Sequence, residues 1–158
     1  MKRVLFVCTG NICRSPTAEG VLRKLAADAG LANRITVDSA GTHGYHSGEA
    51  PDARAVAHAR RRGYDLSSLR ARRFAREDFH AFDLILVMDR EHHALLAKLA
   101  PPSAAQKLRL MLEFARRPGA DEVPDPYYGG PDGFELVLDL IEDAAAGLLD
   151  HLTAELAR

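Results

Sequence analysis

The chain has 158 residues, a length that fits one domain with a well-buried core. Its formal net charge of −1 gives no general attraction to nucleic acid, and no apolar stretch is long enough to span a bilayer. The apolar run near Met1 is too short for a secretory signal, and only two cysteines occur. We therefore expect a cytoplasmic protein without a disulfide framework.

Strand and helix patterns alternate along the chain, which is typical of an α/β fold with a parallel sheet. Short apolar runs predict buried strands over residues 4–7, 35–38, 84–88 and 108–112. Apolar residues at helical spacing predict helices over residues 16–29, 52–62 and 90–99, and Gly30 is a suitable stop for the first. The last helix has the clearest apolar stripe, formed by Phe134, Val137, Leu138, Ile141, Ala145, Leu148, Leu149 and Leu152.

The most informative segment follows the first predicted strand and reads VCTGNICRSP over residues 7–16. Gly10 and Asn11 are residue types that tolerate the positive φ of a tight loop. Ser15 and Pro16 are predicted to be the N-cap and the first residue of the following helix. The segment therefore joins the end of a strand to the start of a helix.

A loop in this position favours a bound anion. Free N–H groups at a helix start, together with successive loop amides, attract phosphate oxygens. The partial positive charge of these N–H groups also favours a thiolate over a thiol at Cys8. The Ser15 hydroxyl, at the predicted start of the helix, could hydrogen-bond this thiolate. Arg14 adds a planar fork that can grip two phosphate oxygens. This pattern predicts a metal-free phosphatase that works through a phosphocysteine intermediate.

Three simpler interpretations compete with this one. The Cys-x5-Arg spacing is weak by itself, because a cysteine is often only a small apolar core residue. A zinc half-site of Cys8 and Cys13 lacks further spaced ligands. A nucleotide-binding loop would continue with Gly-Lys-Ser/Thr, which is absent here. Because strand, turn, cap and spacing all agree, we favour the phosphate-binding loop and predict no metal and no cofactor.

The chain resembles the low-molecular-weight protein tyrosine phosphatases over nearly its whole length. Residues 7–16 are similar to the signature loop of that family, almost letter for letter. Three further segments resemble the family in the right order: DSAGT at 38–42, LVMD at 86–89 and DPYYG at 125–129. The resemblance implies a single phosphatase domain over residues 1–158. It also implies an α/β fold with a four-stranded parallel sheet, helices on both faces and a phosphate-binding loop after the first strand.

The resemblance implies roles for individual residues as well. Cys8 would be the nucleophile, Arg14 the phosphate clamp, Asp125 the general acid and Cys13 the redox partner of Cys8. Phosphate would be bound by Thr9, Gly10, Asn11, Ile12, Cys13, Arg14 and Ser15. The polar network that shapes the loop would consist of Asn11, Ser15 and Ser39. The mouth of the substrate pocket would be lined by Tyr45, Tyr127 and Tyr128, and such an aromatic wall favours flat aryl phosphates.

Asp125 lies between Pro124 and Pro126, which restrict the backbone and place the carboxyl group on a stiff loop. An aspartate before proline is common in turns, and only the resemblance favours the acid role over that interpretation. A tyrosyl leaving group has a pKa of about 10, so its departure at neutral pH is helped by a placed acid. The charge of thiolate-bound phosphate would keep that acid protonated.

The chain departs from the family pattern at Leu69, where relatives often place a histidine that supports the loop asparagine. We therefore expect the network around Asn11 to lack one partner, with a water or another side chain as the alternative that could replace it. The arginine-rich stretch over residues 54–76 is predicted to be a solvated face. The seven histidines show no catalytic spacing and are predicted to be surface or packing residues.

We expect a monomer or weak dimer that hydrolyses phosphotyrosine in proteins or peptides, and small aryl phosphates, releasing inorganic phosphate. Nucleic acid and membranes are not expected as partners. An arsenate reductase would need a distal cysteine pair, which this chain lacks. A protein-arginine phosphatase tends to carry Thr where this chain has Ile12. A phosphopeptide-binding module would need neither the nucleophile nor the acid.

Overall fold

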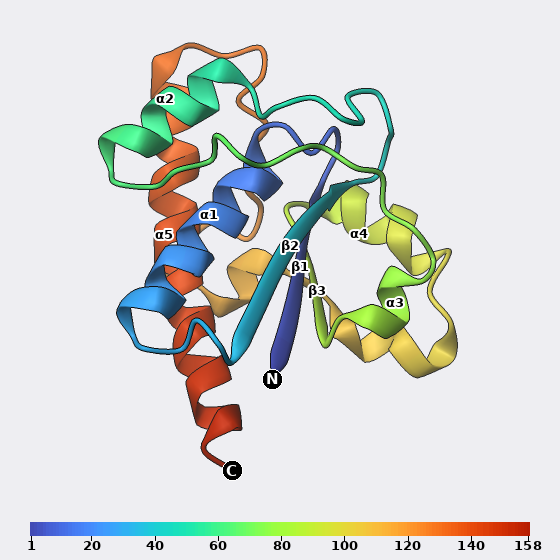
Figure 1. Cartoon of the computed structure of the whole chain (residues 1–158). Coiled ribbons are helices and arrows are strands. Elements are labelled where there is room, and N and C mark those ends of the chain that lie inside the picture. Colours follow the sequence, from blue (N-terminus) through green and yellow to red (C-terminus); the bar gives the residue numbers. More distant parts are fainter.

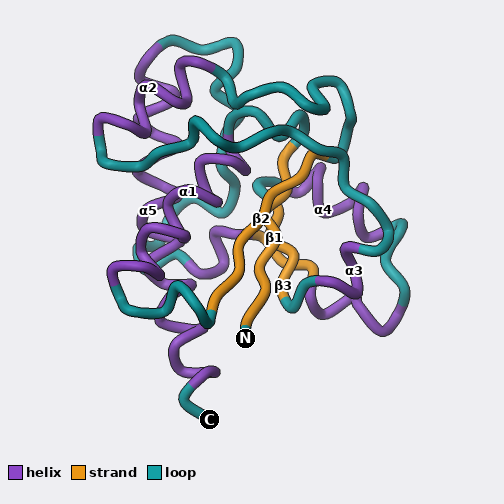
Figure 2. Tube along the Cα trace, viewed as in Figure 1, coloured by secondary structure: helices purple, strands orange, loops and turns teal.

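Four parallel strands form the centre of the computed structural model, which describes residues 1–158 (Figures 1 and 2). The strands are β1 (Lys2–Cys8), β2 (Ile35–Gly41), β3 (Leu84–Val87) and β4 (Leu108–Leu110). Their order across the sheet is β2-β1-β3-β4, and every neighbouring pair is parallel. The α/β fold with a four-stranded parallel sheet is therefore confirmed.

The helices cover both faces of this sheet. They are α1 (Arg14–Asp28), α2 (Ala53–Arg61), α3 (Asp78–Ala81), α4 (Arg90–Ala97) and α5 (Pro131–Leu156). Figure 1 shows α1 and α5 on one side with α2 packed against them, and α3 and α4 on the other. None of these helices combines the length and apolarity that crossing a membrane requires.

From Val4 to Cys8 the central strand β1 is buried on both faces. Val4, Phe6 and Cys8 pack into the core beneath α1 and α5, whereas Leu5 and Val7 pack into the smaller core beneath α4. Successive side chains of a strand point to opposite faces, so a strand covered on both sides is apolar at every position. The same alternation directs the side chain of Cys8 toward the α1 side of the sheet.

The strand order creates a crevice at the carboxyl end of β1. From β1 the chain passes to β2 at one side and later returns to β3 at the other side of β1. At such a switch point the connections leave in opposite directions, and ligands bind in the opening between them. The loop after Cys8 and the start of α4 after β3 both lie at this edge.

The start of α1 differs from the sequence prediction. The helix begins at Arg14 with Cys13 as its N-cap, so the prediction of Ser15 as N-cap and Pro16 as first helical residue was wrong. Ser15 does not cap because its hydroxyl contacts Cys8 instead. Pro16 still falls in the first turn, where a backbone donor has no helical acceptor. Gly30 follows the helix at φ 76°, as a stop residue should.

Candidate active site

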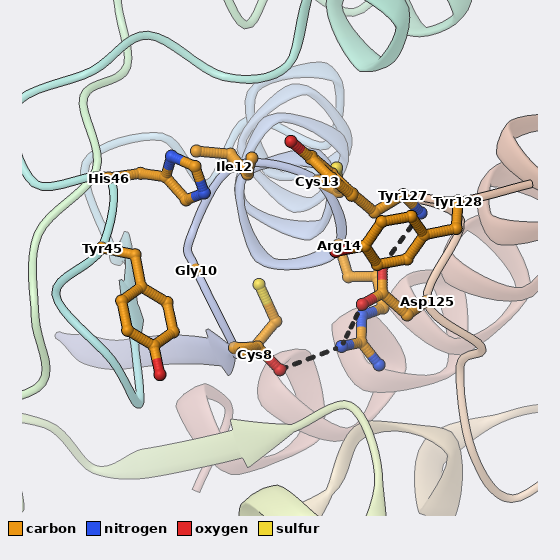
Figure 3. A pocket seen from close by; sticks show the side chains of 11 residues that line it. Cys8, Gly10, Ile12, Cys13, Arg14, Tyr45, His46, Asp125, Tyr127 and Tyr128 are labelled. Atoms are coloured by element: carbon orange, nitrogen blue, oxygen red, sulfur yellow. Dashed lines mark hydrogen bonds and ion pairs between the residues drawn. The ribbon is translucent and has the colours of Figure 1, made fainter.

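A cavity of about 310 Å³ opens at the carboxyl end of β1 (Figure 3). It is lined by Cys8, Thr9, Gly10, Ile12, Cys13, Arg14, Tyr45, His46, Asp125, Tyr127 and Tyr128. The structure thus brings the predicted nucleophile, clamp, acid and all three predicted rim tyrosines to one place. Asn11, Ser15 and Ser39, predicted to support the loop, are buried outside the lining.

The loop between β1 and α1 presents unpaired backbone amides. No main-chain N–H from Thr9 to Ser15 donates a hydrogen bond to any group of the protein. Asn11 is the one non-glycine residue of the chain with a positive φ, 58°, and this conformation turns the loop tightly. Because successive free amides form an anion-binding nest, the loop is organised for a ligand with several oxygen acceptors.

Cys8 lies at the base of this loop and is 2 % exposed. Its Sγ is 3.0 Å from the Ser15 Oγ on the first turn of α1. The carbonyl of Cys8 accepts from the amide of Thr42, which continues the pairing of β1 with β2. The last residue of β2 is Gly41, and a Cβ there would lie 2.8 Å from the carbonyl oxygen of Thr9. Only glycine permits this close approach of the two backbones.

The Arg14 guanidinium is buried and held from several sides. Its NH1 donates to Asp89 Oδ2 at 3.0 Å and to the Val123 carbonyl at 2.9 Å. Its NH2 lies 3.4 Å from Thr9 Oγ1 and 3.8 Å from Asp125 Oδ2. A planar cation fixed in this way can offer its fork to a phosphate in a single orientation.

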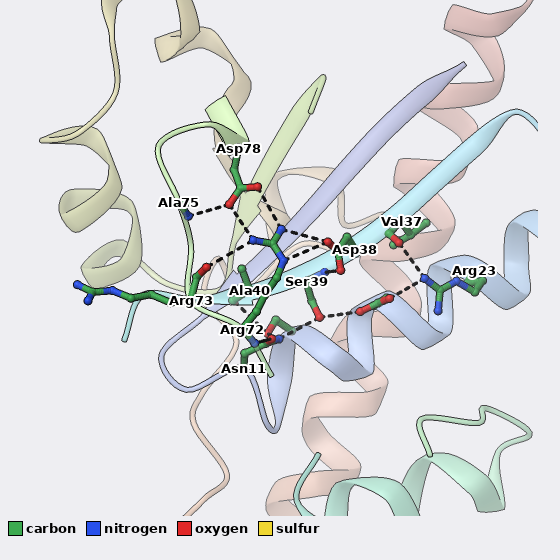
Figure 4. Close-up of polar contacts among 12 residues, drawn as sticks. Asn11, Arg23, Val37, Asp38, Ser39, Ala40, Arg72, Arg73, Ala75 and Asp78 are labelled. Atoms are coloured by element: carbon green, nitrogen blue, oxygen red, sulfur yellow. Dashed lines mark hydrogen bonds and ion pairs between the residues drawn. The ribbon is translucent and has the colours of Figure 1, made fainter. Parts of the chain in front are cut away.

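The side chain of Asn11 fixes the loop in three directions (Figure 4). Its Nδ2 donates to Ser15 Oγ at 2.8 Å and to Ser39 Oγ at 2.9 Å. Its Oδ1 accepts from the backbone amide of Arg72 at 3.0 Å. The expectation that Leu69 leaves this asparagine short of a partner was therefore wrong. A main-chain donor three residues further along the chain satisfies the amide oxygen.

The network continues from Ser39 into α1. The Ser39 hydroxyl donates to Glu19 Oε1 at 2.6 Å, and Arg23 binds the other carboxylate oxygen of Glu19 at 2.6 Å. Burial raises the pKa of Glu19 above its ordinary value, although the Ser39 bond and the Arg23 charge oppose this. The carboxyl group thus ties the loop-supporting serine to the body of the helix.

Part of the arginine-rich stretch over residues 54–76 is structural. Arg72 binds the carboxylates of Asp38 and Asp78 with contacts of 3.0 to 3.2 Å, as Figure 4 shows. Arg62 binds three acidic side chains of α5. For these two arginines the prediction of a solvated face was wrong, because each joins segments far apart in the sequence.

Asp125 sits above the cavity on the segment that precedes α5. Its Oδ1 accepts from the amide of Tyr127 at 3.0 Å, and about half of the side chain is exposed. Tyr127 and Tyr128 follow it, with ring centroids 4.9 Å apart in an edge-to-face arrangement. Tyr45 faces them across the opening (Figure 3). Its ring stacks on that of His43. Aromatic surfaces therefore flank the entrance.

Cys13 lines the cavity as a free, buried thiol. Burial raises its pKa well above the ordinary value, and the negative charges of Asp52, Cys8 and Asp125 act in the same direction. Cys13 is thus protonated at neutral pH. Elsewhere, His, Cys, Asp and Glu side chains form no group of three that could hold a metal ion.

Sequence reasoning missed several groups at the site. His46 lines the cavity, and His92 is 2 % exposed with its Nε2 2.8 Å from Thr9 Oγ1 and 3.4 Å from Arg14. The prediction of surface or packing roles gave no sign that these two histidines lie at the site. Asp89 caps α4 by accepting from the His92 amide while it holds Arg14. For Asp89 the sequence did contain an indication, since this residue ends the LVMD segment that resembles the family pattern.

Comparison with known proteins identifies the group to which these features belong. Residues 3–158 match the family model described as low molecular weight phosphotyrosine protein phosphatase. A low molecular weight protein-tyrosine-phosphatase of Streptomyces coelicolor is 48 % identical over 150 residues, covering 93 % of this chain and 91 % of the relative.

Solved structures agree with the sequence relatives. A protein tyrosine phosphatase of Entamoeba histolytica, crystallised with Hepes in its active site, superposes with a TM-score of 0.95. The two chains are 40 % identical, and the match covers 98 % of this chain and 99 % of the other. An arginine phosphatase of Drosophila superposes with a TM-score of 0.88 at 33 % identity, covering 96 % and 98 % of the two chains.

His92 gives the site a pH-dependent stability. Burial lowers the pKa of His92 from 6.5 to about 4, assisted by the positive charge of Arg14 and opposed by Asp89 and Asp125. Between these two values the unfolded chain binds a proton at His92 that the folded protein does not bind. Stability therefore rises with pH across this window and is lost on acidification.

We predict that His92→Gln flattens this dependence, since the glutamine amide reaches the position of Nε2 and can keep the contact with Thr9 Oγ1 without titrating. The wild-type protein should lose about 2 to 3 kcal/mol more than the variant between about pH 7.5 and about pH 4.5. Urea unfolding at several pH values measures the difference. Parallel curves for the two proteins would show that His92 does not titrate in this way.

Proposed function

This chain belongs to the low molecular weight phosphotyrosine protein phosphatase family and is a protein-tyrosine phosphatase, and we propose that its reaction proceeds through a phosphocysteine on Cys8. One observation carries the proposal above all. The Cys8 Sγ lies beneath a loop whose amides from Thr9 to Ser15 have no partner in the protein. We further propose that residues 1–158 form one phosphatase domain that needs no cofactor.

In the first step the Cys8 thiolate attacks phosphorus. A sulfur–phosphorus bond forms while the bond from phosphorus to the tyrosyl oxygen breaks. The loop amides and Arg14 hold the non-bridging oxygens, where negative charge is concentrated in the transition state. Asp125 gives its proton to the departing oxygen. The Ser15 hydroxyl, 3.0 Å from Sγ, donates to the thiolate before attack.

In the second step a water molecule attacks the phosphocysteine. The Asp125 carboxylate, left unprotonated by the first step, accepts the proton of that water. The sulfur–phosphorus bond breaks, inorganic phosphate leaves and the Cys8 thiolate is restored. Because Asp125 is half exposed on the segment above the cavity, water and leaving group can both reach it.

The substrate is phosphotyrosine in proteins or peptides, and small aryl phosphates enter the same cavity. Tyr45, Tyr127 and Tyr128 line the entrance and offer flat surfaces to an aryl ring. Ile12 also lines the cavity, where an apolar side chain favours a ring over a charged guanidinium. The likeness to a Drosophila arginine phosphatase makes phosphoarginine the competing substrate.

Cys13 is proposed to protect Cys8 from irreversible oxidation. Hydrogen peroxide oxidises the Cys8 thiolate to a sulfenic acid. The Cys13 sulfur then attacks the Cys8 sulfur, a disulfide forms, and the sulfenic hydroxyl leaves as water with the Cys13 proton. Both thiols are free and line the same cavity, which supports this role.

Substrate class is tested with matched phosphotyrosine, phosphoserine and phosphoarginine peptides assayed without added metal. We expect rapid phosphate release from phosphotyrosine alone, and none with Cys8→Ser, because a serine hydroxyl is not ionised in this site. Faster phosphate release from phosphoarginine than from phosphotyrosine would show that phosphoarginine is the substrate. Substantial turnover by Cys8→Ser, with an unchanged melting temperature, would contradict the phosphocysteine intermediate.

The acid role of Asp125 is tested with Asp125→Asn, which keeps an oxygen for the Tyr127 amide. For phosphotyrosine we expect kcat/KM to fall by about 10² to 10⁴, the usual contribution of general acid catalysis. For 2,4-dinitrophenyl phosphate the loss should stay below about tenfold, since its acidic phenol departs without a proton. Equal losses for both substrates would exclude the role.

The protective role of Cys13 is tested by peroxide treatment followed by a thiol reductant. The wild-type protein should regain most of its activity, while Cys13→Ser should regain much less, because its sulfenic acid proceeds to sulfinic acid. Mass spectrometry of the Cys8 peptide distinguishes the products. Sulfinic acid as the main wild-type product would disprove the protection.

A further inference from the structure

The segment that carries Asp125 is attached to the rest of the protein by very few polar contacts. Over residues 124–130 the backbone hydrogen bonds are local, such as that from the Gly129 amide to the Pro126 carbonyl. The only hydrogen bond that reaches this segment from another element comes from Arg54, whose NH2 donates to the Tyr127 carbonyl at 2.9 Å. Arg54 lies in the first turn of α2.

Aromatic rings hold the same guanidinium beside this segment. The Arg54 Cζ lies 5.5 Å from the centre of the Tyr127 ring and 4.8 Å from that of Phe134. Phe134 is buried in the first turns of α5, directly after the segment. Cations are attracted to the faces of aromatic rings, so both contacts favour one position of the guanidinium.

A carboxylate fixes the other side of Arg54. Asp52 accepts from Arg54 Nε at 3.1 Å through one oxygen and from NH2 at 2.9 Å through the other. Asp52 is itself bound to the nucleophile loop, since its amide donates to the Ile12 carbonyl at 2.8 Å. A continuous series of contacts thus runs from the loop of Cys8 through Asp52 and Arg54 to the Tyr127 carbonyl.

These contacts lead directly to the carboxyl group of Asp125. The Tyr127 amide donates to Asp125 Oδ1 at 3.0 Å, so the orientation of Asp125 follows the position of the Tyr127 backbone. Apart from this bond and the more distant charge of Arg14, nothing in the protein holds the carboxyl group. A displacement of Tyr127 would therefore move the proton donor relative to Sγ.

We propose that Arg54 is a positioning residue that fixes the general-acid segment over the nucleophile loop, so that Asp125 meets the leaving oxygen. The inference rests on the proposed acid role of Asp125. Arg54 touches neither phosphate nor the reacting atoms. It acts through the Tyr127 carbonyl, and its effect is confined to steps in which Asp125 transfers a proton.

The proposal requires arginine at this position. The guanidinium fork binds both oxygens of Asp52 while the same group donates to the Tyr127 carbonyl and lies against two rings. A lysine ammonium keeps the charge but has neither the fork nor the planar face. Arg54→Lys should therefore behave much more like Arg54→Met than like the wild-type protein.

Leaving-group dependence provides the test, because kcat/KM reports the steps up to leaving-group departure. With phosphotyrosine, kcat/KM of Arg54→Met should fall between about tenfold and a hundredfold, as for a misplaced catalytic group. With 2,4-dinitrophenyl phosphate it should fall less than about threefold. Arg60→Met is the matched control, since Arg60 is exposed on the same helix and makes no side-chain hydrogen bond or ion pair.

A double variant separates positioning from a general structural effect. In the Asp125→Asn background, Arg54→Met should cause no further loss with phosphotyrosine, because the group that it positions no longer carries a proton. Melting temperatures close to that of the wild-type protein verify that each variant is folded. Full additivity in the double variant would overturn the proposal.

The remaining outcomes distinguish this inference from the function on which it rests. If Asp125→Asn itself shows no leaving-group dependence, the proposed acid role fails. If Asp125→Asn shows it but Arg54→Met loses both substrates equally, the acid role stands and the positioning role fails. If Arg54→Lys kept the wild-type ratio of kcat/KM for the two substrates, the positive charge alone would be sufficient at this position. That result would also reject the proposal.

Discussion

The site depends on one constraint: the amides of the loop from Thr9 to Ser15 must remain unpaired so that they can bind an anion. Unpaired amides inside a protein raise the free energy of the folded state, so other contacts have to hold the loop open. Asn11 does so with three hydrogen bonds from one side chain. Gly41 does so by letting the end of β2 approach the loop backbone. The unfavourable conformation is local, whereas the interactions that maintain it come from several elements.

The two segments that meet at the cavity are held to very different degrees. The nucleophile loop is bonded to β2, to α1 and to the backbone at Arg72. The segment over residues 124–130 receives one hydrogen bond from another element. Segments with few contacts open at a low cost in free energy, and enzymes use them to admit substrates and release products. The difference suits the proposed reaction, in which phosphate oxygens need fixed donors, whereas the proposed acid has to accommodate first an aryl group and then a water molecule.

Most of the fold could be predicted from the sequence, and the errors have physical causes. The four predicted strands lie at the observed positions. The two central strands were readily found because their apolar runs are buried on both faces, and the edge strands β2 and β4 keep enough buried apolar residues to show the pattern. The start of α1 was misplaced because capping rules assume a free serine hydroxyl, and the hydroxyl of Ser15 contacts Cys8 instead. The partner of the Asn11 side chain was missed because a backbone amide, that of Arg72, has no signature in the sequence. The role of Arg72 itself was missed because an ion pair between distant segments looks like surface charge in a linear sequence.

The sequence by itself determined the succession of strand, tight loop and helix, and with it the positions of Cys8 and Arg14. These features depend on neighbouring residues, because strand burial, the φ of a loop residue and the free amides of a helix start are local properties. The tertiary structure decided which distant groups surround them. With β3 beside β1, the parallel strands end at one edge, so Asp89 reaches the guanidinium of Arg14. The approach of α2 to the segment before α5 likewise places Arg54 on the Tyr127 carbonyl. Such contacts follow from strand order and helix packing, which no local spacing encodes.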